Sequence, residues 1–392
     1  MALFKYRGTI SASKSLYNRA LIVQSYFPVL ELEGDSQCDD VMYMRKAITE
    51  IKDRSKILCG EGGTTFRFMT LRASRQMGVH ALYAAPSLMK RPHDDMIDIL
   101  KQLGVQAKIK RDGLLMVSEG WKRPRKPLQV GTSISSQYAS GLLLNSWLLP
   151  FPLDIALTGD LRSQSYLLMT TDFLTKMGMK ILADSKRLVV PEEQRLTKLN
   201  YRVDSDVSSI FSVAALAALF GTADFLNFPQ SQNQPDLAFI EIVRQMGVTL
   251  EMSPEMTLRV SKASVLKGVE ANLGQCPDLF PVLAALCAFA TTPSRLYGAP
   301  QLAHKESNRL EKTSELLKLM GVSHQLNSDG MTIQGGIDLK TVAPFQFHPA
   351  HDHRMVMAAA LFAKAGAPIE ILQRDCVNKS FPEYWTIWGG QE

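Results

Sequence analysis

Four helix ends that recur at nearly constant spacing constrain the fold of this chain more than any other feature of its sequence. Each consists of a large apolar residue, a glycine and a further apolar residue, which is typical of an amphipathic helix stopped by glycine in the left-handed C′ position. The segments are residues 99–105, 173–179, 242–248 and 316–322. Their glycines are 74, 69 and 74 residues apart. A common helix ending explains one or two such matches, but four at this spacing predict a repeated module of a helix followed by strands.

Apolar helices predict how these modules are layered. Residues 136–149 and 208–220 are rich in small and apolar side chains, and a helix that is apolar all round belongs inside a domain, with sheets outside it. The chain has 392 residues, more than one hydrophobic core usually covers. We therefore expect an α/β protein of repeated βαβ-type units in two similar halves. The chain should cross between the halves near Ser13 and near Asp204–Asp206, so that site residues at the crossings face each other across a cleft.

Composition and charge exclude several classes of protein. The chain is 46% hydrophobic and 21% charged, as expected of a globular protein. The net charge is a mild +6. Basic residues gather between Lys108 and Lys126, where we expect a solvated hairpin edge rather than a nucleic-acid site, because a series of interleaved aromatic side chains is lacking.

Cysteine usage and the apolar runs favour a reducing compartment. The five cysteines are odd in number and form no Cys-x-x-Cys pair, so neither a disulfide framework nor a zinc ribbon is expected. The first residues show no apolar signal-peptide region. The longest apolar runs are too short to span a bilayer. We expect a cytoplasmic protein.

Polar segments of the first half are typical of helix starts that bind anions. Ser13–Arg19 places lysine and serine at a strand-to-helix junction, where backbone N–H groups attract anions. Gly60–Arg67 contains glycines that let the backbone approach an anion closely, although it is neither a Walker A loop nor a dinucleotide fingerprint. Ser135–Gln137 opens an apolar helix, with Ser163 and Tyr166 in the matching position one unit later.

Polar segments of the second half combine cations with acids. In His304–Arg309 a glutamate lies between two cations, which keep its carboxylate ionised unless it is buried. His351–Arg354 opens another apolar helix, and Lys379 follows near the end of the chain. Asp278 heads an otherwise apolar helix, where it is either an N-cap or a functional acid.

A metal site is the competing interpretation of the histidines. His348, His351 and His353 form a His-x-x-His-x-His pattern. This is not a standard zinc spacing, and no glutamate follows to act as a base. We therefore expect no metal at these positions.

Together and in this order, the six segments resemble the EPSP synthases (5-enolpyruvylshikimate-3-phosphate synthases, or 3-phosphoshikimate 1-carboxyvinyltransferases), which are enolpyruvyl transferases. The resemblance runs from Gly8 to Trp385. It implies two domains, each of three repeated units with helices inside and sheets outside, an inside-out α/β barrel. It also implies that residues 14–204 form one domain, that residues 1–13 join residues 205–392 in the other, and that the active site lies in the cleft between them.

The resemblance also implies site residues, position by position. Those around phosphoenolpyruvate are Lys14, Gly63 (through its backbone), Arg91, Gln137, Arg309, Arg354 and Lys379. Those around shikimate 3-phosphate are Ser15, Arg19, Ser135, Ser136, Gln137, Ser163, Tyr166, Asp278, Gln301 and Lys305. Asp278 and Glu306 match the acid/base pair, and Lys14 and Lys379 complete the catalytic set.

The reaction implied by the resemblance explains why such residues are needed. The 5-hydroxyl of shikimate 3-phosphate attacks C2 of phosphoenolpyruvate, which is a poor electrophile until C3 is protonated, so a positioned acid is required. The tetrahedral adduct then loses phosphate, and the product leads to chorismate and the aromatic amino acids. Lysines and arginines stabilise the anions. No cofactor, metal, nucleic acid or membrane partner is implied, and we expect a monomer.

Several positions depart from the pattern of the family. In this chain Ser11–Ala12 stands where the family has Pro-Gly, Glu61 and Gln301 each stand where it has Asn, and Met89 stands where it has Arg. Pro235 replaces a Gly of the family, and Asn308 replaces an Asp. None removes a residue assigned to catalysis.

Two alternatives stay open: a divergent homologue that binds anionic metabolites, and transfer to another acceptor such as UDP-N-acetylglucosamine. Against the latter, residues 86–92 lack the cysteine that such enzymes carry in the matching loop. Gly63 matches the glycine that leaves room for glyphosate, so we expect glyphosate to compete with phosphoenolpyruvate.

Overall fold

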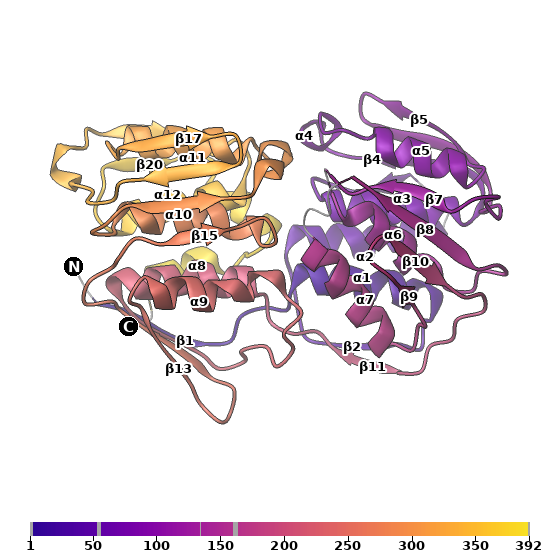
Figure 1. Cartoon of the computed structure of the whole chain (residues 1–392), viewed down its shortest axis with the longest axis horizontal. Coiled ribbons are helices and arrows are strands. Elements are labelled where there is room, and N and C mark those ends of the chain that lie inside the picture. The colour runs from indigo at the N-terminus through magenta and orange to yellow at the C-terminus, as the bar shows by residue number, and fades with distance from the viewer. Residues whose placement is uncertain (1–2, 53–55, 134, 160–163, 391–392) are drawn as a thin grey trace. The chain divides into compact units, whose positions relative to one another are not determined.

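The structure, a computed structural model, describes residues 3–52, 56–133, 135–159 and 164–390 (Figure 1). The chain divides into two compact units. We call Met1–Ser11 with Asp204–Glu392 the C-terminal unit, and Ala12–Val203 the N-terminal unit. Within the described ranges, no helix is long and apolar enough to cross a membrane.

Each unit contains two four-stranded sheets and one two-stranded sheet within the described residues. In the N-terminal unit these are, in spatial order, β3 (Ile57–Leu58), β4 (Met77–Tyr83), β6 (Gly113–Glu119) and β5 (Gln106–Lys110); β7 (Leu128–Gly131), β8 (Leu153–Thr158), β10 (Arg187–Val190) and β9 (Leu182–Ala183); and β11 (Asn200–Arg202) with β2 (Glu31–Glu33). In the C-terminal unit they are β1 (Phe4–Gly8), β12 (Gly221–Phe225), β14 (Leu258–Ser261) and β13 (Thr249–Met252); β15 (Glu270–Asn272), β16 (Ser294–Tyr297), β18 (Gly330–Ile333) and β17 (His324–Asn327); and β19 (Phe345–Phe347) with β20 (Ile369–Ile371).

The four-stranded sheets share one connectivity. A strand pairs in parallel with the next, and an antiparallel hairpin then joins the second strand, as in β3, β4 and the hairpin β5–β6. Four helices lie between consecutive strands that pair in parallel: α3 (Gly63–Ser74), α6 (Gln137–Leu144), α10 (Phe280–Ala288) and α12 (His353–Lys364). Together with α1 (Lys14–Tyr26), which follows β1, and α8 (Val207–Phe220), which precedes β12, we call them inner helices. The helices before the hairpins are α5 (Asp94–Gln102), α7 (Gln164–Lys176), α9 (Phe239–Gln245) and α11 (Arg309–Leu319). Further elements are α2 (Asp39–Lys52), α4 (Pro86–Met89), α13 (Tyr384–Gly389) and the 3-10 turns η1 (Pro235–Ala238), η2 (Pro277–Leu279), η3 (Pro300–His304), η4 (Leu339–Thr341) and η5 (Arg374–Lys379).

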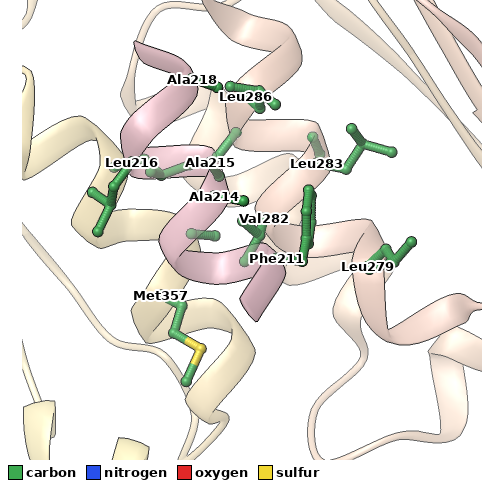
Figure 2. Packing of buried hydrophobic residues seen from close by; sticks show 14 of the residues in the cluster. Phe211, Ala214, Ala215, Leu216, Ala218, Leu279, Val282, Leu283, Leu286 and Met357 are labelled. Atoms are coloured by element: carbon green, nitrogen blue, oxygen red, sulfur yellow. The ribbon is translucent and has the colours of Figure 1, made fainter. Parts of the chain in front are cut away.

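The inner helices form the core of each unit. Every residue of α10 is buried, and so are nearly all residues of α8 and α12. Figure 2 shows Phe211 and Ala214 of α8 beside Val282 of α10, with Met357 of α12 close to them. The strands bury alternate residues, as in β6, so one face of that sheet remains exposed. The α/β fold class, with helices inside and sheets outside, is confirmed.

The repeated helix ends are also confirmed. Gly104, Gly178, Gly247 and Gly321 all have positive φ angles, of 78°, 102°, 91° and 68°. Each lies two residues after the last residue of α5, α7, α9 or α11 and precedes a hairpin. The basic residues Lys108 and Lys110 lie exposed on the edge strand β5, as the sequence predicted.

One predicted helix is too long. The sequence predicted a helix over residues 136–149, but α6 ends at Leu144. Asn145 follows, and its side-chain amide donates to the backbone oxygens of Gly141 at 2.9 Å and Phe68 at 3.3 Å. An asparagine that takes up a helix carbonyl in this way competes with the next backbone hydrogen bond. Leu148, with φ of 56°, then turns the chain.

Gly221 allows β1 to pair with β12, since Phe4 is its register partner and an added Cβ would lie 1.9 Å from the Phe4 backbone oxygen. We expect Gly221→Ala to push the strands apart and to lower the free energy of unfolding by about 1–3 kcal/mol, measured by urea denaturation. Gly389→Ala is the control, because an added Cβ meets no described atom within 4 Å there. Equal unfolding of the two variants would contradict this role of Gly221.

Candidate active site

Many of the expected site residues lie at the starts of inner helices. Lys14, Gly63 and Gln137 are the first residues of α1, α3 and α6. Arg354 is the second residue of α12, and Asp278 lies in η2 directly before α10. The first turn of a helix offers unpaired N–H groups and a partial positive charge, both of which favour anions. The repeat therefore gives each unit several helix starts suited to anionic ligands.

Arg309 is the centre of an ion-pair cluster in the C-terminal unit. Its Nη1 donates to Asp278 Oδ1 and its Nη2 to Glu306 Oε2, each at 2.8 Å. Nε and Nη2 donate to the two oxygens of Asp352 at 2.8 and 3.2 Å. Lys305 Nζ reaches Asp278 at 3.1 Å. Burial alone would lower the pKa of Arg309, but the three carboxylates raise it. The structure thus brings together the expected residues Asp278, Lys305, Glu306 and Arg309.

Asp352 holds this cluster against α12. Its side chain is completely buried and accepts a hydrogen bond from the backbone N–H of Arg354 at 3.0 Å, which caps the helix. It also accepts from Ser307 Oγ at 3.0 Å. The same carboxylate therefore fixes the helix that carries Arg354 and the guanidinium of Arg309.

Asp278 is a charged member of the cluster rather than a helix cap. The residue that precedes α10 as its N-cap is Leu279, so the N-cap interpretation of Asp278 is wrong. Burial alone would raise the pKa of Asp278, but Lys305, Arg309 and Arg354 hold it well below its usual range. In this state the carboxylate is ionised and weakly basic.

Asp236 in η1 is a second acid, whose pKa depends on the charges of Asp278 and Arg354. It is 2% exposed; Ser208 donates a hydrogen bond to its Oδ2, while its Oδ1 meets no hydrogen-bond partner in the described part of the chain. Burial, followed by the negative charge of Asp278, raises the pKa of Asp236 to about 7, and Arg354 opposes this rise. This carboxyl group therefore changes its charge near neutral pH.

Lys14 in the N-terminal unit is held by an acid. Its Nζ lies 2.8 Å from Oδ2 of Asp40, in the first turn of α2, and both side chains are largely buried. The backbone oxygen of Asp40 accepts from Thr65 Oγ1 at 3.2 Å, which connects this pair to α3. The lysine expected at the phosphoenolpyruvate site is thus fixed at the start of α1.

Arg19 supports other expected residues through its own hydrogen bonds. Its Nη1 donates to the backbone oxygen of Ser15 at 2.7 Å, its Nη2 to that of Tyr166 at 3.3 Å, and its Nε to Thr170 Oγ1 at 2.8 Å. Burial lowers the pKa of Arg19 to about 10. The structure therefore brings Ser15, Arg19 and Tyr166 together. Ser163 lies outside the described residues.

Three side chains converge on Gly63. A Cβ built on Gly63 would lie 3.3 Å from Nη1 of Arg67, 3.3 Å from Nη1 of Arg91 and 3.5 Å from Oε1 of Gln137. The backbone N–H of Gln137 donates to Ser135 Oγ at 3.2 Å. Ser136, which lies between them, is buried and is the N-cap residue of α6. Glycine at position 63 thus leaves space beside two guanidinium groups and an amide.

The remaining expected residues are buried in the C-terminal unit. Lys379 is the last residue of η5, and Arg354 and Gln301 are similarly enclosed. Gln301 Nε2 donates to the backbone oxygen of Gly274 at 2.9 Å, while its buried Oε1 lacks a hydrogen-bond partner among the described residues. In the same part of the chain, no group of three His, Cys, Asp or Glu side chains could hold a metal ion.

Comparison with known proteins places this arrangement in one family. The family model described as EPSP synthase (3-phosphoshikimate 1-carboxyvinyltransferase) matches residues 29–388. The chain belongs to the EPSP synthase family. The 3-phosphoshikimate 1-carboxyvinyltransferase of Methanococcoides burtonii is 32% identical over 83% of this chain and 76% of the relative. That of Bacteroides fragilis is 28% identical over 96% of this chain and 92% of the relative.

Solved structures agree with this EPSP synthase fold. The EPSP synthase of Acinetobacter baumannii superposes with a TM-score of 0.75 at 21% identity, covering 99% of this chain and 95% of that one. The enolpyruvyl transferase NikO of Streptomyces tendae gives 0.71 at 11% identity, covering 98% and 94%. At these sequence identities, the two superpositions establish that this chain shares the fold of those proteins.

Some departures from the EPSP synthase pattern have a local explanation. Asn308 caps α11, where its Oδ1 accepts from the backbone N–H of Glu311 at 3.3 Å, and asparagine caps helices as well as aspartate does. Pro235 is the first residue of η1, a position where its missing N–H is not needed. Glu61 is half-buried and forms no ion pair with any described residue.

Sequence reasoning missed four residues that the structure places at these sites: Asp40, Arg67, Asp236 and Asp352. Arg67 carried a usable signal, since it lies four residues after Gly63 and therefore on the same helix face. Acids at helix starts such as Asp40 and Asp352 are too common to indicate a partner. Asp236 belonged to the segment noted for Pro235, but its burial could not be read from the sequence.

The titration of Asp236 predicts a pH-dependent stability. Its folded pKa lies above its unfolded value, so its stabilising contribution is complete below about pH 4 and is lost as the pH rises through about 7. Asp236→Asn has no carboxyl group to ionise at this position, so its stability should not fall in this way. Relative to the unmodified protein, we expect its free energy of unfolding to increase by about 1–3 kcal/mol between pH 4 and pH 8. Urea unfolding across this range measures the difference, with Asp112→Asn, on an exposed turn, as control. A difference that does not vary with pH would contradict the assignment.

Proposed function

We propose that this chain is an EPSP synthase that transfers the enolpyruvyl group of phosphoenolpyruvate to the 5-hydroxyl of shikimate 3-phosphate, with release of phosphate, in chorismate biosynthesis. The Arg309 cluster carries the proposal, because it puts two carboxylates, Asp278 and Glu306, on one buried guanidinium. A site that only binds anions does not need two acids. The names of the curated relatives support the same activity.

The first step is an addition to the double bond. Glu306, protonated for this step, donates its proton to C3 of phosphoenolpyruvate, and C2 becomes electrophilic. The 5-hydroxyl oxygen forms a bond to C2 while its proton passes to Asp278. The result is a tetrahedral adduct that still carries its phosphate.

The second step is an elimination. The bond between C2 and the phosphate oxygen breaks, and inorganic phosphate leaves with the proton that Asp278 had taken from the hydroxyl. C3 loses a proton to Glu306, which restores the acid and forms the new double bond. Lys14 and Lys379 stabilise the negative charge on the departing phosphate.

The ion pairs of Arg309 suggest how substrates activate the two acids. Arg309 contacts both Asp278 and Glu306. A substrate carboxylate that takes over part of this guanidinium releases Glu306 to be protonated. A phosphate that draws Lys305 away from Asp278 makes that carboxylate more basic. Substrate binding thereby prepares the acid and the base.

In this proposal, residues of both units bind the substrates. To phosphoenolpyruvate we assign Lys14, Gly63, Arg91 and Gln137 of the N-terminal unit with Arg309, Arg354 and Lys379 of the C-terminal unit. To shikimate 3-phosphate we assign Ser15, Arg19, Ser135, Ser136, Gln137, Ser163 and Tyr166 with Asp278, Gln301 and Lys305. In this proposal residues 14–204, and residues 1–13 with 205–392, are two domains that act on the same pair of substrates. We further propose a monomer that works in the cytoplasm without a cofactor.

Phosphate release tests the proposal. We expect the purified protein to release phosphate from phosphoenolpyruvate when shikimate 3-phosphate is present and not when it is absent. Glu306→Gln removes the acid and should lower kcat by about a hundredfold or more, whereas Glu311→Gln, an exposed change in the first turn of α11, should leave it unchanged.

Three outcomes would contradict parts of the proposal. Release without the acceptor would indicate a phosphatase, and binding of shikimate 3-phosphate without release would indicate a regulatory homologue. Full activity of Glu306→Gln would remove Glu306 from the acid's role.

Glyphosate inhibition tests the assignment of Gly63. We expect glyphosate to compete with phosphoenolpyruvate. Gly63→Ala should weaken the inhibition and raise the KM for phosphoenolpyruvate, because its methyl group enters the space between Arg67, Arg91 and Gln137. Inhibition that higher phosphoenolpyruvate does not relieve would count against this assignment.

A further inference from the structure

Two loops of the C-terminal unit follow neighbouring parallel strands and lead to residues that we assign to phosphoenolpyruvate. β19 and β20 pair in parallel, with Phe347 opposite Ile371, and the N–H of Leu372 donates to the oxygen of Phe347 at 3.0 Å. After this bond, one loop leads from β19 to α12, which carries Arg354, and the other leads from β20 to η5, which ends at Lys379. The two cations thus follow loops that start side by side.

The loop before α12 contains a strained turn. The N–H of Asp352 donates to the oxygen of Pro349 at 3.1 Å. The two residues between them, Ala350 and His351, have φ angles of 55° and 57°. A turn with positive φ at both central positions is normally built from glycine, asparagine or aspartate. Alanine and histidine adopt this conformation at a cost, so contacts with surrounding residues must stabilise the turn.

Side chains hold both central residues of this turn. The N–H of Ala350 donates to Nδ1 of His348 at 3.1 Å. The N–H of His351 donates to Oε1 of Gln373, in the other loop, at 3.1 Å. Because a backbone N–H can only donate, this bond identifies the amide oxygen of Gln373 and leaves its Nε2 as a donor. That Nε2 lies 2.8 Å from Nε2 of His351, which therefore accepts the second bond.

We call these two hydrogen bonds the His351–Gln373 pair. It requires a neutral imidazole with its proton on Nδ1, because a protonated ring would place an N–H against the N–H of the amide. The pair is thus sensitive to which hydrogens its members carry, as a purely apolar contact would not be.

The pair connects the starts of two helical elements. Gln373, with φ of 49°, is the N-cap residue of η5, and its backbone oxygen accepts the N–H of the third residue of that 3-10 helix at 3.0 Å. Lys379 is the last residue of η5. On the other side, Asp352 directly follows His351 and caps α12 by accepting the N–H of Arg354 at 3.0 Å. A shift of either partner of the pair therefore moves the start of an element that carries a proposed ligand-binding cation.

The two cations depend on this support because they are buried. Arg354 is 3% exposed and Lys379 is 4% exposed. Nε of Arg354 has no hydrogen-bond partner among the described residues. How well both side chains reach one small anion is then set by where their backbones lie. A misplacement of about 1 Å at such a site can cost about a hundredfold in rate.

We propose that Gln373 is a positioning residue for phosphoenolpyruvate, which sets the positions of Arg354 and Lys379 relative to each other through its two hydrogen bonds to His351. The inference rests on the proposed function for the identity of the ligand and for the assignment of both cations to it. The effect of Gln373 passes through the two loops rather than through contact with the substrate.

Removal of the amide tests this inference. Gln373→Met keeps the length of the side chain and removes both hydrogen bonds, so we expect it to raise the KM for phosphoenolpyruvate about three- to tenfold. The KM for shikimate 3-phosphate should not change, because its assigned residues lie outside the two loops. Gln346→Met is the matched control, since Gln346 Nε2 donates to Glu370 Oε2 at 2.8 Å in an exposed contact between the same two strands. It should leave both KM values unchanged.

A second variant covers the case in which Gln373→Met does not fold. Gln373→Gly adopts the φ of 49° without strain, but it also lacks the amide, so the KM for phosphoenolpyruvate should rise as in Gln373→Met. An unchanged KM in Gln373→Gly, or a rise in Gln373→Met no larger than that in Gln346→Met, would overturn the proposal.

Gln373→Glu gives a readout that a loss of packing would not produce. A carboxylate only accepts, so it keeps the bond from the N–H of His351 and bonds Nε2 of that ring only when the ring is protonated. Histidine changes its charge between about pH 5 and pH 8. We therefore expect the KM of Gln373→Glu for phosphoenolpyruvate, divided by that of the unmodified protein, to fall about three- to tenfold as the pH is lowered across this range.

The ratio removes the titrations that both proteins share. One is that of phosphoenolpyruvate itself. Besides Arg354 and Lys379, the charged or titratable side chains on the two loops and on the elements packed against them include Lys312, His348, Asp352, His353, Arg374 and Asp375. Adding His351→Leu to both proteins should make the ratio independent of pH. A ratio that is constant while His351 is present, or that varies equally without it, would overturn the role of the pair.

Calorimetric titration of phosphoenolpyruvate separates the inference from the proposed reaction. If the unmodified protein binds phosphoenolpyruvate but releases no phosphate, the proposed function fails, and the dissociation constants of the same variants still test Gln373. If turnover occurs and the KM is unchanged in the Gln373 variants, the positioning role fails and the proposed function stands.

Discussion

The contacts of the Arg309 guanidinium are the interaction on which the rest of the candidate site depends. One buried side chain holds Asp278, Glu306 and Asp352 at hydrogen-bond distance. Removing one partner from such a buried pair typically costs about 3–5 kcal/mol, since the other charge is left without compensation. The arrangement therefore holds the two proposed acids, Asp278 and Glu306, in ion pairs with one guanidinium. Anionic substrates are the natural means of exchanging these contacts, because they offer the guanidinium and Lys305 new partners.

The repeated fold explains why so many cations and hydrogen-bond donors can be assembled. The inner helices α8, α10 and α12 are buried along nearly their whole length. Lys14, Gly63, Gln137 and Arg354 all stand within the first two residues of inner helices. The apolar helix bodies supply the core, and their N-termini supply positive potential. One module thus meets the demands of stability and of anion binding.

The sequence predicted the elements better than it predicted the partners of side chains. The glycine helix ends were predictable because a left-handed residue is required locally, whereas the early end of α6 depends on the contact of Asn145 with Phe68, 77 residues away. Asp278 lies 27 residues from Lys305 and Asp352 lies 43 from Arg309, so neither pair shows a spacing pattern. The donors of Arg19 reach Tyr166 and Thr170, which lie 147 and 151 residues away in the chain, so no local pattern indicates them. Pairing across the fold, rather than local propensity, is what the sequence alone could not supply.

The exchange of hydrogen at C3 of phosphoenolpyruvate tests the central claim most directly, because the claim is that an acid in the Arg309 cluster protonates this carbon. The reaction would be run in D2O with phosphoenolpyruvate and shikimate 3-phosphate, and the product analysed by mass spectrometry and NMR. The account predicts deuterium in the vinyl methylene group of the product, arising from the methyl group of the adduct, and no such exchange in Glu306→Gln. Product formed without deuterium at that carbon would contradict protonation at C3, and with it the role assigned to the cluster.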